Sequence, residues 1–230
     1  IKDEKQRQWY IEQTDLNGWA YDVLAFQIKS DLYSRQVLGD KPNNFKRTLK
    51  SPQSELAKDM MKDPYILDLS NLKESYIETE LENAMVERIK TVLLELGNGF
   101  SFVWNQYRIE VDGDEYFIDM LFYHTKLHCY IVVELKNTQY KPEYAGKLNF
   151  YLSAVDDLLK SENDNPSIGI ILCREKKKFS VEYSLRDINK PIGVSSYEVS
   201  NILPKYIMEA LLTEEDLNLH IDISENEEDN

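Results

Sequence analysis

The sequence predicts an α/β fold in which helices flank a central mixed β-sheet, with an all-helical module at the N-terminus. Three observations support this prediction. Apolar residues recur three and four positions apart in the first part of the chain, and they alternate with polar residues after Gly97-Asn98-Gly99. A three-strand meander follows, and then a helix and two apolar strands. Because a crossover helix joins strands that can run parallel, we expect the sheet to be mixed.

Residues 1–70 are expected to form the helical module, which is of a helix-turn-helix-like or winged-helix-like kind. The segment 3–15, DEKQRQWYIEQTD, has the apolar spacing of an amphipathic helix, and Asn17-Gly18 ends it. An apolar stripe over 20–32 predicts a second helix. Ser51-Pro52 provides an N-cap and a first helical residue for a further short helix, which Pro64 closes.

Residues 71–212 are expected to form the sheet-containing domain. Its predicted elements are a helix over 78–96, strands over 100–111, 115–124 and 128–136, a helix over 142–160, and strands over 167–173 and 191–199. Asp112-Gly113 is typical of a tight hairpin turn between the first two strands. The acidic segment 213–230 is expected to be a disordered tail.

The net charge of −14 argues at first against nucleic acid, since phosphate recognition depends on cationic side chains. Much of the acidity lies at the C-terminus, however, where residues 201–230 hold one basic and nine acidic side chains. The total charge therefore excludes no class of function, and the local pattern of charges has to decide.

Cysteine and histidine usage predicts no thiol or imidazole chemistry. Cys129 and Cys173 lie in apolar, strand-like runs, which favours buried thiols over a disulfide or a metal site. Three histidines, widely scattered, are too few for a histidine-based zinc site.

No run approaches the ~20 apolar residues of a membrane span, so we expect a cytoplasmic protein without a membrane partner. Because the chain begins with Ile1 rather than Met, it is expected to be a fragment of a longer protein.

The segment IVVELK, residues 131–136, places two opposite charges at the end of a core strand. Residues two apart share a face of a strand, so Glu134 and Lys136 point the same way and Leu135 points the other way. The preceding strand carries Asp119 among apolar neighbours. With the turn centred near residue 126, Asp119 is expected opposite Val133, within about one residue of Glu134.

Two converging carboxylates predict a site for a divalent cation, Mg²⁺ or Mn²⁺. Mg²⁺ binds one or two carboxylates together with water and phosphate oxygens, and the backbone carbonyl of Leu135 can add a ligand. A lysine beside the metal, here Lys136, can position a water for attack on a phosphodiester. The alternative is structural: Glu134 and Lys136 would form a surface ion pair at an exposed strand end, and Asp119 would accept backbone hydrogen bonds.

The same residues resemble the PD-(D/E)XK nuclease superfamily, and in particular bacterial YhcG-type nuclease-domain proteins. The resemblance runs from LLELGNGFSF through FIDMLFYH and IVVELK to YLSAVDDLL, and on through NPSIGIILC and SLRDINKPIGV. It covers about residues 77–200, and WYIEQTDLNGWAYDVLAFQI resembles the family's N-terminal DNA-binding segment. The resemblance implies a restriction-endonuclease-like core, with Asp119 and Glu134 as metal ligands and Lys136 as the water-orienting or charge-stabilising base.

The sequence departs from the superfamily pattern at several positions. Ile118 replaces the proline before Asp119, which changes no reacting group. Many members carry Gln-x-x-x-Tyr on the next helix, where this chain has Lys147 and Tyr151, and Lys147 is expected to contact a phosphate. Tyr144 joins these two at the rim of the site. Some members add a glutamate from the first helix, for which Glu82 is the candidate; the alternative for Glu82 is an exposed helix-surface carboxylate.

These features predict a Mg²⁺-dependent endonuclease-type hydrolase acting on nucleic acid, with DNA as the expected substrate. The alternative is a binding module on a nuclease scaffold, which holds nucleic acid or protein without cleaving it. The N-terminal helices are expected to contact DNA or a partner, or to form a homo-oligomer. The basic cluster 174–178 either touches the phosphate backbone or is a solvated turn.

Overall fold

The computed structural model describes residues 1–69, 72 and 75–200 of the 230-residue chain. These residues divide into two compact units, the first covering residues 1–30 and the second beginning at Asp31. The predicted tail, 213–230, lies outside the described residues. The domain boundary predicted at residue 70 remains a prediction.

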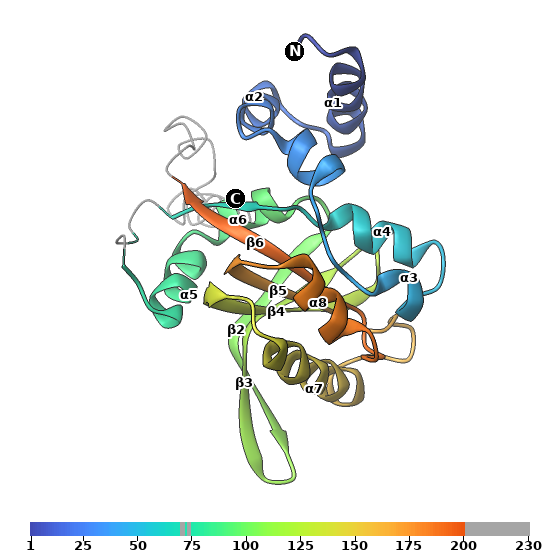
Figure 1. The fold of residues 1–230 in the computed structure, drawn as a ribbon, viewed down its shortest axis with the longest axis vertical. Helices are drawn as coiled ribbons and strands as arrows, with labels where there is room; N and C mark the ends of the chain where they lie inside the picture. Colours follow the sequence, from blue (N-terminus) through green and yellow to red (C-terminus); the bar gives the residue numbers. More distant parts are fainter. Residues whose placement is uncertain (70–71, 73–74, 201–230) are drawn as a thin grey trace, which may run out of the picture. The chain divides into compact units, whose positions relative to one another are not determined.

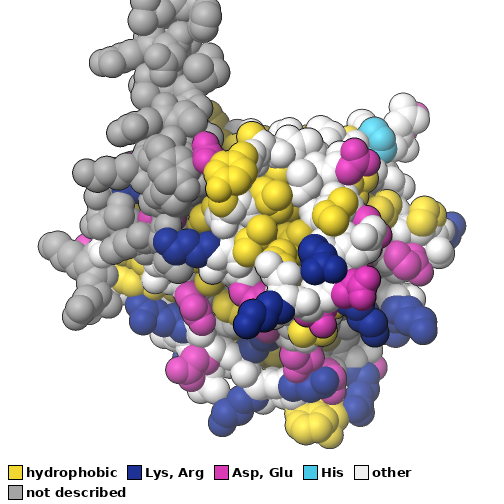
Figure 2. Space-filling model, turned by 90° about the horizontal axis from the view of Figure 1, so that it is seen from above, with side chains coloured by type: hydrophobic (Ala, Val, Ile, Leu, Met, Phe, Trp, Pro, Cys, Tyr) yellow, Lys and Arg dark blue, Asp and Glu magenta, His cyan; other side chains and the backbone are white. Residues whose placement is uncertain are grey.

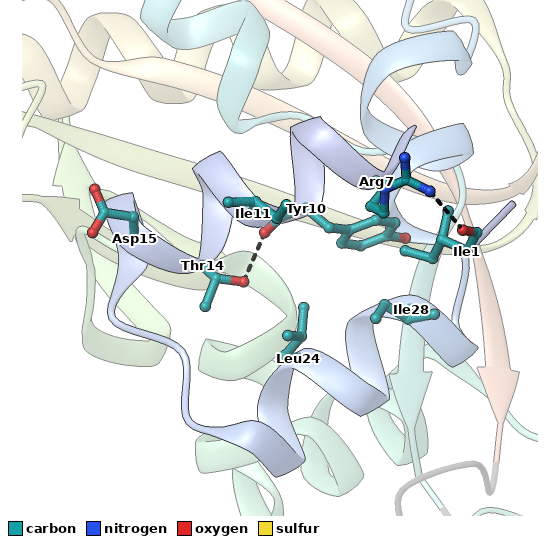
Figure 3. A pocket seen from close by; sticks show the side chains of 8 residues that line it. All are labelled: Ile1, Arg7, Tyr10, Ile11, Thr14, Asp15, Leu24 and Ile28. Atoms are coloured by element: carbon teal, nitrogen blue, oxygen red, sulfur yellow. Dashed lines mark hydrogen bonds between the residues drawn. The ribbon is translucent and has the colours of Figure 1, made fainter. Parts of the chain in front are cut away.

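The first unit contains the helical hairpin α1 (Glu4–Asn17) and α2 (Tyr21–Lys29), which confirms the two helices predicted there. Gly18 ends α1 in the left-handed conformation, with a φ of 64°, which an L side chain adopts only at a cost. The Tyr10 hydroxyl donates to the carbonyl of Gln27 over 3.1 Å and ties the two helices together. A pocket of about 460 Å³ lies in this unit, and Leu24 and Ile28 of α2 point into it (Figure 3).

The second unit is built on a six-stranded sheet with the order β1-β6-β5-β4-β3-β2 (Figure 1). Its strands are β1 (Tyr65–Asp68), β2 (Phe100–Val111), β3 (Asp114–His124), β4 (Cys129–Gln139), β5 (Ile168–Glu175) and β6 (Ile192–Ser200). β2, β3 and β4 form the antiparallel meander, whereas β4, β5, β6 and β1 pair in parallel. The predicted mixed sheet is therefore confirmed.

Helices cover both faces of this sheet. They are the π-helical turn η1 (Ser34–Leu38), α3 (Phe45–Thr48), α4 (Gln53–Met60), α5 (Glu78–Glu87), α6 (Ile89–Leu96), α7 (Pro142–Leu158) and α8 (Lys178–Leu185). Buried residues of α7 and α8 share one apolar core with the sheet, and those of α3 to α6 share the other. The crossovers through α7 and α8 explain why β4, β5 and β6 run parallel.

Several elements differ from the sequence prediction. The helix predicted over 78–96 is two helices, because the backbone leaves the helical region at Arg88, where φ is −115°. The short helices η1 and α3, strand β1 and helix α8 were not predicted at all. Residues 65–68 were left outside the predicted sheet, although β1 pairs with β6 from Tyr65 opposite Tyr197 to Asp68 opposite Ser200.

Charges of both signs are mixed on one face of the molecule. On the face drawn in Figure 2, Lys and Arg side chains are interspersed with Asp and Glu around a group of hydrophobic side chains. No described helix has the length and apolar character needed to cross a membrane.

Candidate active site

The two central strands stop pairing beside the predicted site. The β3–β4 ladder ends with Met120 opposite Val133, one residue away from the predicted pairing of Asp119 with Val133. Beyond that point, the backbone N–H of Leu135 donates to Oδ2 of Asp119 over 2.8 Å. The Asp119 carboxylate thus accepts the Leu135 N–H, which in a continuous ladder would bind a backbone carbonyl of the neighbouring strand. Asp119 therefore lies against the Glu134-Leu135 segment, as predicted.

Glu134 is completely buried, with 0% of its surface exposed. Its Oε1 accepts from Nζ of Lys147 over 2.6 Å and lies 3.0 Å from Nζ of Lys136. Its Oε2 is also buried and has no hydrogen-bond partner among the described residues. The structural alternative is thus borne out in its ion pair and in the backbone hydrogen bond to Asp119, but the pair is buried and not at an exposed strand end. A charged pair at this depth requires compensation by other groups.

Lys136 is held by several groups at once. Its Nζ donates to Oε2 of Glu78 and to the carbonyl of Leu135, each over 2.8 Å, in addition to its contact with Glu134. The ring of Tyr144 lies 5.4 Å from the same nitrogen. Glu78 stands in the first turn of α5, and sequence reasoning missed it because nothing local shows that α5 reaches β4. The ammonium group is thus fixed in position.

The pKa values follow from this clustering. Burial and the charge of Glu134 raise the pKa of the Asp119 carboxyl to about 7, although the N–H of Leu135 and the two lysines oppose the rise. Burial lowers the pKa of Lys136, but Glu134, Glu78 and Asp119 outweigh it and raise the pKa above its ordinary value. The pKa of Lys147 is also raised, because Glu134 and Asp119 outweigh the effect of its burial. Both lysines therefore stay protonated.

Helix α7 brings Lys147 to the site. It begins at Pro142, three residues after β4 ends, and packs on β4 and β5 through residues that include Leu148 and Leu152. A Cβ atom at Gly169 of β5 would lie 2.6 Å from the Leu148 side chain, so the glycine allows the helix to approach closely. This close approach places Lys147 over the buried Glu134.

The three remaining predicted residues lie in different surroundings. Tyr151 is only 3% exposed, beneath the Lys147 ammonium at 5.1 Å, so it belongs to the core rather than to an open rim. Tyr144 is half-buried, and its hydroxyl lies 3.2 Å from that of Thr138. Glu82 is 4% exposed and accepts from Asn105 and Gln106 of β2, so the alternative of an exposed helix-surface carboxylate is wrong.

The basic cluster 174–178 is largely paired. Lys176 contacts Asp63, and Lys178 lies 3.3 Å from Asp40. The guanidinium of Arg174 lies over the ring of Tyr76 at 4.4 Å, a contact that the sequence did not suggest. A solvated turn therefore does not describe the whole cluster, because three of its five residues make specific contacts with other parts of the chain.

Oxygen atoms at the site suit a hard cation. Among the described residues, no group of three or more His, Cys, Asp and Glu side chains is arranged to hold a metal. The two carboxylates Asp119 and Glu134 are near enough to interact electrostatically, the Oε2 of Glu134 has no partner among the described residues, and the N–H of Leu135 binds Asp119. Mg²⁺ needs no more protein ligands than these, since water and phosphate oxygens complete its shell.

Comparison with known proteins gives one family match. Residues 58–212 match the family described as the YhcG PDDEXK nuclease domain. Over 200 residues the chain is 30% identical to "Putative nuclease YhcG" of Escherichia coli (strain K12), covering 86% of this chain and 53% of that protein. The chain thus spans about half the length of this curated relative.

Solved structures show only distant likeness. A repair endonuclease from Pyrococcus abyssi matches with 13% identity and a TM-score of 0.36, covering 58% of this chain and 50% of that chain. EndoMS in a complex titled EndoMS-dsDNA2 matches with 14% identity and a TM-score of 0.37, covering 57% and 48%. Likeness at this level supports no inference about substrate or mechanism.

Proposed function

The chain belongs to the YhcG PDDEXK nuclease domain family, and from this premise we propose that it is a divalent-metal-dependent endonuclease that hydrolyses phosphodiester bonds of DNA. The observation that carries the proposal is the pair Asp119 and Glu134 at the end of the β3–β4 ladder. One oxygen of this pair, Oε2 of Glu134, is buried without a hydrogen-bond partner among the described residues. A buried carboxylate oxygen without a donor is costly unless a cation uses it.

Asp119, Glu134 and the carbonyl of Leu135 are the residues that would hold Mg²⁺ or Mn²⁺. Their donor atoms are all oxygens, as both ions prefer. Such an ion would supply Lewis-acid stabilisation of phosphate charge and would lower the pKa of a bound water. The raised pKa of Asp119, about 7, supports the proposal, since two carboxylates in one buried place favour a cation between them.

Lys136 would hold the attacking water and offset the charge that develops on the phosphate. Its pKa is raised, so it keeps its proton at neutral pH and serves as a fixed positive charge rather than as a proton acceptor. Glu78 and the Leu135 carbonyl hold its Nζ in place. Tyr144, half-buried beside Lys136, would line the path of the substrate.

The test is cleavage of DNA by the purified chain with Mg²⁺ or Mn²⁺. We expect Asp119→Asn, Glu134→Gln and Lys136→Met each to lower the cleavage rate by at least about a hundredfold, while the unfolding transition is retained. Asp157→Asn is the matched control, because Asp157 is an exposed carboxylate at the far end of α7. Cleavage that persists in all three site variants would refute the assignment.

A second candidate function is binding without cleavage. It is favoured by the two ammonium groups on Glu134, which already balance much of the charge of the site. Calorimetry that finds no divalent-cation binding, together with retained DNA binding, would select this function. Either function leaves the N-terminal helices as a surface for DNA, a partner or a second copy, and light scattering of the chain tests the last of these. The cytoplasmic location stays a prediction.

A further inference from the structure

Lys147 occupies the coordination space of a buried carboxylate. Its Nζ lies 2.6 Å from Oε1 of Glu134, the shortest contact that this oxygen makes. The Lys147 side chain is 42% exposed, whereas the Glu134 side chain is 0% exposed. The ammonium group therefore reaches inward from solvent to a fully buried carboxylate, and it neutralises a charge that burial would otherwise make costly.

The two lysines on Glu134 are held very differently. The Lys136 side chain is 10% exposed, and in addition to Glu134 it binds Glu78 and the Leu135 carbonyl. Lys147 donates to Glu134 and otherwise interacts with Tyr151, whose ring lies beneath it at 5.1 Å. A lysine stem is flexible, so this ammonium group can move outward toward solvent without leaving the aromatic ring.

A divalent cation on the unpartnered Oε2 of Glu134 would lie close to the Lys147 ammonium group on Oε1, because both oxygens belong to one carboxylate. Mg²⁺ requires ligand oxygens at about 2.1 Å, so its positive charge would lie within a few ångströms of the Lys147 nitrogen. Repulsion at that separation is strong in a partly buried site. Occupation of Glu134 by a metal therefore opposes the Lys147 contact and favours its withdrawal.

On this geometry we propose that Lys147 is a built-in counter-ion that holds the metal-ligand position of Glu134 until a divalent cation displaces it. The displaced ammonium group then turns outward and binds a phosphate oxygen of the substrate. The proposal rests on the metal site of the proposed function and adds a residue that couples metal binding to substrate binding. Lys147 is a positioning residue for the metal and a contact for the substrate.

The displacement lowers the apparent affinity for metal. A site that is free only part of the time binds its ligand more weakly by that fraction, and removal of the competing group restores the intrinsic affinity. A neutral side chain at position 147 should thus bind metal more tightly in the absence of nucleic acid. This outcome is opposite to that for a ligand, whose removal weakens metal binding.

The first measurement is calorimetric titration of the full chain with Mg²⁺ or Ca²⁺ alone. Lys147→Gln should bind about tenfold more tightly than the wild type, whereas Lys147→Arg, which keeps the positive charge, should not. Lys141→Met is the matched control, since it removes a positive charge just before α7, where Lys141 lies 4.0 Å from the exposed Glu143. Thermal unfolding of each variant checks that it is folded. If Lys147→Gln does not fold, Lys147→Arg still tests the proposal, because it should bind metal no more tightly than the wild type.

The second measurement is the salt dependence of DNA binding, with Ca²⁺ and with a chelator. In Ca²⁺, Lys147→Gln should lower the slope of log affinity against log salt by about one phosphate contact. In chelator, the slope should equal that of the wild type, because Lys147 then remains on Glu134. An equal fall of the slope with Ca²⁺ and with chelator would show that metal binding does not control the contact between Lys147 and phosphate.

The outcomes separate the inference from the proposed function. If the wild type binds metal, Asp119→Asn abolishes that binding and Lys147→Gln binds no more tightly than the wild type, only the inference is overturned. If the wild type binds neither Mg²⁺ nor Ca²⁺, the metal-dependent function fails and the inference fails with it. Tighter binding by Lys147→Gln, with Lys141→Met unchanged, supports both.

Discussion

At the residue scale, Glu134 shows how a charged group is kept inside a sheet. The side chain is wholly buried, and replacing either neighbouring lysine would leave part of its charge uncompensated. Because the same carboxylate is the proposed metal ligand, Lys147 compensates its charge in the metal-free protein and, on our proposal, leaves it when metal binds. The contact that stabilises the buried Glu134 carboxylate therefore competes with the metal binding that the proposed chemistry needs.

His124 provides a separate, pH-dependent contribution to stability. It is 5% exposed, its Nδ1 accepts from the N–H of Leu127 over 3.1 Å, and burial together with Lys126 lowers its pKa from 6.5 to about 4. The unfolded chain therefore binds a proton between pH 6.5 and pH 4 that the folded chain excludes. Stability is complete above pH 6.5 and is lost as the pH falls toward 4, by up to roughly 3 kcal/mol.

Urea denaturation at pH 7 and pH 4 checks this prediction. His124→Asn keeps an acceptor for the Leu127 N–H but does not titrate, so its free energy of unfolding should fall less with acid than that of the wild type. His128→Asn is the control, because His128 is exposed and its positive φ of 48° also suits asparagine. Equal acid sensitivity in all three proteins would refute the role given to His124.

Strand periodicity predicted that Asp119 and Glu134 would lie together, but it did not predict the contacts that the helices make with them. Asp119 and Glu134 were expected together because a two-residue period and a short turn fix the register of neighbouring strands to within one residue. The contacts of Glu78 with Lys136 and of Lys147 with Glu134 depend on how helices pack across the sheet. No local pattern in the sequence carries that information.

At the element scale, a buried ion pair joins parts of the chain that lie far apart in sequence. Glu95 of α6 is 2% exposed, receives Nη1 of Arg35 from η1 at 2.5 Å and accepts the N–H of Ile66 in β1 over 3.0 Å. Lys62 lies 4.0 Å away, and burial lowers its pKa to about 8. This cluster fixes β1, the edge strand, against α6.

Removing the carboxylate should be severe. Glu95→Gln removes the carboxylate charge that compensates the buried guanidinium of Arg35, and we expect it to lower the free energy of unfolding by roughly 3–5 kcal/mol. The matched control is Glu115→Gln on the β2–β3 hairpin, where an exposed pair with Arg108 is screened by water and should show no measurable change. Chemical denaturation compares the two, and similar losses would contradict the distinction.

The elements missed by the sequence have no clear local pattern. All four residues of β1 are buried, so they show no alternation, and the strand is defined by parallel pairing with β6 about 130 residues later. In α8, Phe179 and Tyr183 are exposed while Val181 and Leu185 are buried, which hides the helical period. The helix at 142–158 and the hairpin at Asp112-Gly113 were predicted because their signals are local.

At the scale of the whole molecule, the sheet is completed by residues that the sequence placed in the N-terminal module. β1 closes its edge against β6, and η1, α3 and α4 contribute buried residues to the same unit, among them Arg35, Phe45 and Ala57. The residues from Asp31 to Asp68 therefore belong structurally with the proposed catalytic sheet, whereas 1–30 form a unit of their own. Deletions on either side of Asp31 should thus have unequal effects.

We expect a chain that begins at residue 31 to keep an unfolding midpoint close to that of residues 1–230, and to keep metal binding. A chain that begins at residue 69 loses β1, Arg35 and Lys62, which leaves the Glu95 carboxylate without its cations and the edge of β6 unpaired. Exposed strand edges pair with other chains, so this shorter chain should unfold earlier and associate. Thermal unfolding and light scattering of the two chains, compared with residues 1–230, distinguish these outcomes, and equal stability of the two would place the structural boundary near residue 70 after all.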